Sequence, residues 1–161
     1  MRWCWLVVAV LLMGIGGSGF RVQGADAGEE KTVPVPVSDR VRFGVVDVFV
    51  DSGGDGLAVW QVEMKAVAGD VKIVGIESGG HAAYKEPPFY DPAAMMGGRV
   101  ILGAYSLEDE ALPTGKTRVA RVHVRVGGDA KPEYEVKLVV AAAKAGKPIA
   151  AKVMVAEGEG Q

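Results

Sequence analysis

Valine-rich segments in which apolar and polar residues alternate constrain the fold of this chain more than any other feature. Three of them read LAVWQVEMKA (57–66), RVARVHVRV (118–126) and EYEVKLVV (133–140). Successive side chains of a strand point to opposite faces, so each segment predicts a strand with one buried and one wet face. The residues expected to be buried are Ala58, Trp60, Val62, Met64, Ala120, Val122, Val124, Val126, Tyr134, Val136, Leu138 and Val140.

Four further strands are expected at 43–51, 71–77, 99–106 and 149–156, because glycine, proline and acidic clusters separate these apolar runs. Valine outnumbers leucine and isoleucine together. Its β-branched side chain favours sheets over helices, and no long stretch has helical periodicity. About seven to nine half-buried strands in one domain predict an all-β fold, an antiparallel two-sheet sandwich.

The amino terminus has the features of a secretory signal peptide. Arg2 supplies the positive charge, an apolar run follows at 5–15, and Ala25-Asp26-Ala27 fits a small-residue cleavage site. Cleavage after Gly24 is the weaker alternative. The apolar run is shorter than the roughly 20 residues that span a bilayer, although an uncleaved anchor remains an alternative. Because the only cysteine, Cys4, lies in this segment, the exported chain is expected to have no disulfide.

The chain is therefore expected to have four parts: a signal peptide (1–27), an extended lead-in (28–42), the sandwich (43–156) and a flexible tail (157–161). The VPVPV sequence in the lead-in can form only an edge strand or an extended approach, because proline cannot donate to a ladder. The formal net charge of −2 argues against a nucleic-acid partner. We expect export to the periplasm, the cell surface or the medium, with no membrane span in the mature chain.

The DSGGDG sequence at 51–56 looks at first like the start of a calcium loop. An EF-hand-type loop needs oxygen ligands at positions 1, 3 and 5 and a glutamate at position 12. Position 3 is Gly53 and position 12 is Val62, so only Asp51 and Asp55 remain as ligands. The glycines instead suit a hairpin connection between the strand that ends at 51 and the strand that starts at 57. We therefore predict a hairpin and no metal or other cofactor.

Residues 46–79 read VDVFVDSGGDGLAVWQVEMKAVAGDVKIVGIESG, and residues 112–126 read LPTGKTRVARVHVRV. From about Val45 to Val155, this order of segments resembles the cohesin-type modules of bacterial extracellular systems. The Y-D-P tripeptide of that family follows its second strand, whereas here it occurs in a later loop, at Tyr90-Asp91-Pro92. The resemblance implies a jelly-roll-like β-sandwich and a dockerin-like or envelope protein partner, although it maps no dockerin-binding residue. Because carbohydrate-binding modules share this architecture, a polysaccharide ligand is the alternative.

The long segment 78–98 is the first candidate recognition site, because loops of this length are often functional. It contains one histidine, three aromatic residues and two methionines: His81, Tyr84, Phe89, Tyr90, Met95 and Met96. Alternatively, Phe89 and the methionines fold back and cap one end of the sandwich. Trp60 is expected in the core from its position in the alternation. The aromatic side chains expected to face solvent are Tyr84, Tyr90 and Tyr105.

Arg121, His123 and Arg125 form a basic row on the wet face of their strand. Cross-strand pairing with the charges of the next strand is expected, and the alternative is a flat polar docking surface. Those next-strand charges are Glu133, Glu135 and Lys137. The residues predicted to bind a ligand or partner are therefore His81, Tyr84, Phe89, Tyr90, Tyr105, Arg121, His123 and Arg125.

Catalysis has little support in this sequence. No cysteine nucleophile, G-x-S-x-G elbow or H-E-x-x-H helix is present in the exported part. The acidic run at 108–110 is interpreted as turn and surface charge. We expect a non-catalytic, exported binding or scaffolding module that recognises a protein, or alternatively a polysaccharide through its loop aromatics.

Overall fold

The computed structural model describes residues 40–107 and 112–158 of the 161-residue chain. The expected signal peptide and its cleavage sites, the VPVPV sequence, most of the lead-in and the acidic run at 108–110 lie outside the described residues, as do the last three residues of the expected tail. The first strand starts at Val41, two residues before the expected boundary, and the last strand ends at Glu157.

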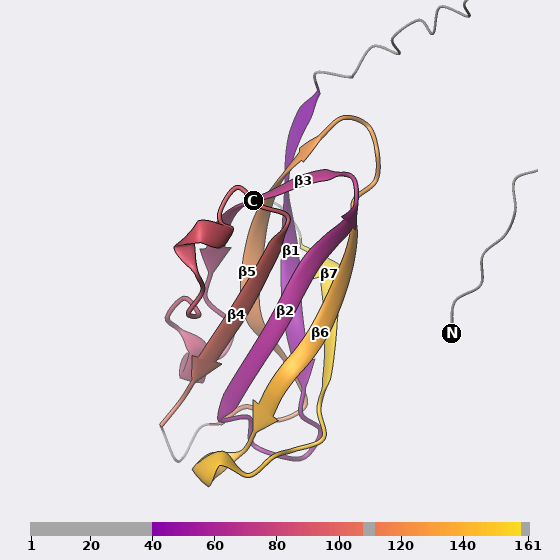
Figure 1. The fold of residues 1–161 in the computed structure, drawn as a ribbon. Coiled ribbons are helices and arrows are strands. Elements are labelled where there is room, and N and C mark those ends of the chain that lie inside the picture. Colours follow the sequence, from indigo (N-terminus) through magenta and orange to yellow (C-terminus); the bar gives the residue numbers. More distant parts are fainter. Residues whose placement is uncertain (1–39, 108–111, 159–161) are drawn as a thin grey trace, which may run out of the picture. The chain divides into compact units, whose positions relative to one another are not determined.

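Seven strands in two antiparallel sheets make up the described part of the chain (Figure 1). They are β1 (Val41–Asp51), β2 (Val59–Ala68), β3 (Asp70–Glu77), β4 (Arg99–Tyr105), β5 (Lys116–Gly127), β6 (Glu133–Ala142) and β7 (Lys152–Glu157). One sheet has the order β3-β5-β1-β7 and the other has the order β4-β2-β6. We call them sheet A and sheet B. The predicted all-β, antiparallel two-sheet sandwich is confirmed.

The remaining regular elements are three short 3-10 turns, η1 (Ala82–Tyr84), η2 (Pro92–Ala94) and η3 (Lys144–Gly146). The first two lie in the long connection between β3 and β4, and the third lies between β6 and β7. None of the helices in the described residues has the length and apolar character needed to cross a membrane.

Consecutive strands never share a sheet in this fold. The odd-numbered strands form sheet A and the even-numbered strands form sheet B, so every connection crosses from one layer to the other. The shortest crossing is the single residue Gly69, whose φ of 83° lies in the region that favours glycine. All pairings within the sheets are consequently between strands that are distant in sequence.

The predicted hairpin at 51–56 is wrong for this reason. β1 pairs with β5 and β7, whereas β2 pairs with β4 and β6, so DSGGDG connects two different sheets. It is still a hydrogen-bonded turn: the Gly53 N–H donates to Asp51 Oδ1 at 3.0 Å, and Ser52 Oγ donates to the Asp55 carbonyl at 2.8 Å. Within residues 40–107 and 112–158, no cluster of three His, Cys, Asp or Glu side chains could hold a metal ion.

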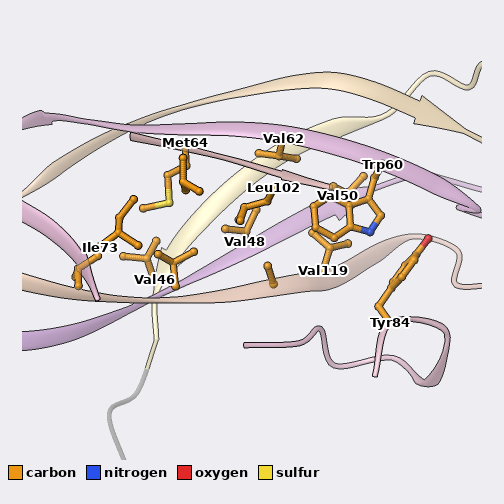
Figure 2. Packing of buried hydrophobic residues seen from close by; sticks show 14 of the residues in the cluster. Val46, Val48, Val50, Trp60, Val62, Met64, Ile73, Tyr84, Leu102 and Val119 are labelled. Atoms are coloured by element: carbon orange, nitrogen blue, oxygen red, sulfur yellow. The ribbon is translucent and has the colours of Figure 1, made fainter. Parts of the chain in front are cut away.

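The core lies between the two sheets, where the valines of β1 and β5 meet the inward side chains of β2 and β4 (Figure 2). The predicted inward residues of β2 and β5 are all buried, and Trp60 is among the most buried side chains. On β6, the inward side chains from Tyr134 to Leu138 pack against this core.

Val140 departs from the prediction. Gln61 of β2 pairs with Val140, but the next residue, Val62, pairs with Leu138, so a bulge at Val139 inserts one extra residue. A one-residue shift moves every later side chain to the opposite face of the strand. Val140 is therefore 38% exposed on the outer face of sheet B.

Candidate functional site

The outer face of sheet A has a basic row that is neutralised by the neighbouring strands. The Arg121 guanidinium donates to both carboxylate oxygens of Asp47 on β1, at 2.8 and 3.0 Å. His123 Nε2 lies 2.7 Å from the Glu77 carboxylate on β3. Arg125 lies 3.7 Å from Asp70 on β3. Each member of the predicted basic row thus has a carboxylate partner on an adjacent strand.

The expectation of cross-strand pairing is correct in kind, but the expected partners Glu133, Glu135 and Lys137 are wrong. These residues belong to β6, which lies in sheet B, whereas the basic row belongs to β5 in sheet A. The chain crosses between the layers after β5, so the next strand in sequence is not the neighbouring strand in space.

Asp47 is the most buried charged residue of this face. The hydrogen bonds from Arg121 lower the pKa of the Asp47 carboxyl below its usual value, with burial opposing and the charges of Arg121, Arg118 and His123 adding to the effect. Asp47 therefore remains ionised at neutral pH and acts as the anionic centre of the basic row.

Tyr84 is a core residue, and its expected exposure to solvent is wrong. It is 3% exposed, its hydroxyl donates to the Leu57 carbonyl, and its ring meets Trp60 edge-on at 6.0 Å. Figure 2 shows Tyr84 reaching from the loop toward Trp60. Burial raises the pKa of the Tyr84 hydroxyl, which remains protonated and can donate. The loop is thus anchored to the core by Tyr84.

His81 begins η1, where its Nδ1 accepts a hydrogen bond from the Ala83 N–H at 3.2 Å. It lines a polar hollow of about 530 Å³ together with Lys116 and Arg118. His81 therefore lines a different hollow from Phe89 and Tyr90.

Phe89 behaves in the opposite way to Tyr84, and the alternative in which it caps the sandwich is wrong. Its backbone exchanges two hydrogen bonds with Gly103 of β4, at 2.8 and 3.0 Å, so it extends the edge of sheet B. Its side chain is 69% exposed and stacks on Tyr105, which is 57% exposed, with ring centroids 6.0 Å apart. Of the methionines, Met95 packs against the core and Met96 is exposed.

An open hollow of about 450 Å³ lies beside this aromatic pair on the outer face of sheet B. We call it the aromatic hollow, and the residues of its lining that matter below are Gln61, Phe89, Asp91, Ile101, Gly103, Tyr105 and Val140. Gly103 leaves this strand position without a side chain. The predicted site residue Tyr90 lines the same hollow and is half-buried.

The other end of the same sheet face is charged. Arg99 Nε donates to Glu63 Oε1 at 2.6 Å, and this bond lowers the pKa of the Glu63 carboxyl. Lys65 pairs in register with Glu135, and Glu63 with Lys137. The outer face of sheet B is therefore divided into a charged end and an apolar, aromatic end.

A second hollow, of about 380 Å³, lies at the opposite end of the sandwich, where β7 stops pairing with β1 at Val46. Its lining is mixed and includes the apolar residues Val46, Val124 and Val126 and the charged residues Arg42, Asp129, Lys131 and Glu157. Phe43 also lines it and is 74% exposed. This hollow contains none of the predicted site residues.

Three of the eight predicted site residues come together in the structure, namely Phe89, Tyr90 and Tyr105. Ile101, Gly103 and Val140 also line the aromatic hollow and are not among the predicted site residues. A signal for Ile101 is present in the sequence, because the strand expected at 99–106 has apolar residues on both of its faces. Comparison with family models, with curated proteins and with solved structures gives no match for this chain.

Proposed function

We propose that this protein is an exported, non-catalytic binding module of cohesin-like type, and that another protein docks on its aromatic hollow. The observation that carries the proposal is the exposed Phe89–Tyr105 pair on a sheet face. Aromatic residues dominate the energetics of protein interfaces, and a contiguous exposed apolar patch commonly marks such a site.

A protein ligand is favoured over a polysaccharide by the surroundings of the rings. The two rings stack on each other, so part of each face is already covered. The neighbouring side chains Ile101 and Val140 are aliphatic and offer no hydrogen bonds to sugar hydroxyls, although Gln61 and Asp91 of the same lining could do so. An apolar centre bounded by the charged end of the same sheet face has the composition of a protein interface.

A binding role is also favoured over an enzymatic one. Hydrolysis of a glycosidic bond uses two carboxylates placed across the substrate. In the described part of the chain, the lining of the aromatic hollow includes a single carboxylate, Asp91. The cohesin-like assignment and export rest on the sequence features described above, and the two-sheet sandwich is the fold that the resemblance implies.

The test is a capture experiment with the immobilised protein and the envelope and secreted fractions of the cells that produce it. Phe89→Ala and Tyr105→Ala remove the aromatic pair, whereas Phe43→Ala removes an equally exposed phenylalanine of sheet A and is the matched control. Insoluble polysaccharides are tested alongside with the same variants.

The proposal predicts stoichiometric recovery of one protein by the wild type and by Phe43→Ala, with recovery lost in both variants of the aromatic pair. Retention on a polysaccharide that depends on Phe89 and Tyr105 would replace the protein ligand with a glycan. Recovery that is insensitive to both substitutions would refute the aromatic hollow as the docking site.

A further inference from the structure

The charge of the aromatic hollow indicates the chemistry of its ligand. We propose that the hollow receives a basic side chain, lysine or arginine, of the protein partner. This inference rests on the proposed function, because it specifies what the docking partner presents. Three features of the hollow support it: one unpaired carboxylate, two exposed aromatic rings and an aliphatic border.

Among the residues that the structure describes, Asp91 is the only charged one that lines the aromatic hollow. Its Oδ1 accepts a hydrogen bond from the Ala93 N–H at 2.9 Å, which fixes the carboxylate at the start of η2. It forms no ion pair with any residue in the described ranges 40–107 and 112–158. The carboxylates of Asp47, Glu63 and Glu77, by contrast, each have a basic partner within the molecule.

The aromatic pair favours a cation for a second, independent reason. The face of an aromatic ring carries partial negative charge and attracts an ammonium or guanidinium group. The same preference occurs elsewhere in this protein, where Lys116 Nζ lies 4.6 Å from the centroid of the Phe49 ring. Within residues 40–107 and 112–158, no basic side chain lines the aromatic hollow.

The size and the border of the hollow fit the stem of a long basic side chain. Ile101 and Val140 supply aliphatic surface for the methylene groups, which lysine and arginine bury while their charged heads remain near water. Gly103 also lines the hollow and contributes no side chain to it.

Three tripeptides test the proposal: acetyl-Leu-Arg-Leu-amide, acetyl-Leu-Gln-Leu-amide and acetyl-Leu-Glu-Leu-amide. Each is titrated into the full-length protein, and binding is measured from the NMR shifts of the Gly103 and Gln61 amides. We expect the arginine peptide to bind roughly tenfold more tightly than the glutamine peptide, and the glutamate peptide to bind most weakly.

Asp91→Asn is the informative variant, because asparagine keeps the hydrogen bond to the Ala93 N–H while removing the charge. It should reduce the preference for arginine over glutamine by a few-fold, whereas Asp129→Asn, an exposed carboxylate outside the hollow, should leave it unchanged. Phe89→Ala should weaken binding of the arginine peptide more than binding of the glutamine peptide. Equal binding of the three peptides, or the absence of shifts at Gly103 and Gln61, overturns the proposal.

The failure of this inference can be told apart from failure of the proposed function. If a captured protein depends on Phe89 and Tyr105 but not on Asp91, the hollow is a protein docking site that does not select a basic side chain. If arginine peptides bind as expected and no protein is captured, the basic-ligand site stands and the docking function fails.

Discussion

The outer faces of the two sheets differ in whether their side chains have partners within the molecule. On sheet A, Arg121 and His123 each meet a carboxylate of a neighbouring strand. On sheet B, the Phe89–Tyr105 pair and the aliphatic residues beside it have no covering element among the described residues. The basic row was a candidate docking surface, yet its charges are already paired.

Because its charges are already paired within the molecule, the basic row is weaker evidence for a docking surface than the uncovered apolar patch. A partner that docked on sheet A would have to compete with existing ion pairs and remove water from them. A partner that docked on sheet B would bury apolar surface that the fold leaves in water, which is favourable in itself. We therefore propose sheet B as the docking face.

The largest effect on the free energy of unfolding is expected from Tyr84, which lies in the core beneath the aromatic hollow. Tyr84→Ala removes a buried ring that contacts Trp60, and we expect the free energy of unfolding to fall by about 3–5 kcal/mol. Denaturant titration followed by tryptophan fluorescence measures this. A loss below about 1 kcal/mol would mean that Tyr84 does not support sheet B.

A smaller effect on the free energy of unfolding is expected from substitutions in the ion pairs on the outer face of sheet A. Asp47→Asn should lower the free energy of unfolding at neutral pH by about 2 kcal/mol, because it weakens a hydrogen-bonded charge pair. Since the pKa of Asp47 is lowered in the folded protein, its stabilisation is present above the unfolded-state value of 3.8. That stabilisation is lost as the pH falls through the folded pKa.

When unfolding is measured from neutral to strongly acidic pH, the free energies of unfolding of the wild type and of Asp47→Asn should therefore converge at acidic pH. A difference between them that stays constant over the whole range would contradict the assigned role of the Asp47 charge in the basic row.

On the aromatic face of sheet B, the substitution that is expected to abolish the proposed docking should hardly affect stability. We expect Phe89→Ala to change the free energy of unfolding by less than about 1 kcal/mol, because the side chain is mostly exposed. Phe43→Ala should behave alike and serves as the control. If Phe89→Ala destabilised the protein as much as Tyr84→Ala, Phe89 would be a structural cap and the contrast between the two faces would disappear.

The smallest expected effect is that of calcium, for which we predict no change in Tm. Asp51 and Asp55 lie in a turn whose hydrogen bonds are made within the chain, and no third carboxylate joins them among the described residues. Thermal unfolding with and without millimolar calcium checks this. An upward shift would show that the turn binds the ion in the folded state.

All seven strands were predictable from the sequence, because alternation and turn residues are local properties. The inward side chains of β2 and β5 followed from the same pattern. Val140 did not, since a bulge depends on how β6 aligns with β2. The partners of Arg121 and His123 also could not be predicted, because they depend on which strands become neighbours.

The candidate site was predictable only in part. The long loop and its aromatic residues were visible in the sequence, but Tyr84 and Phe89 looked equivalent there. They have opposite roles because η1 brings Tyr84 under Trp60, while Phe89 pairs with Gly103 at the edge of β4. Composition identifies an aromatic side chain, whereas its exposure depends on contacts with distant strands.

The sequence by itself therefore determined the β class, the strands and most of the side chains that face the core. The tertiary structure decided which strands pair, which charges are neutralised and which aromatic residues remain exposed. The physical reason is that each of the six connections crosses between the sheets. Neighbours in sequence are then never neighbours in a sheet, and local patterns cannot report the contacts that form the site.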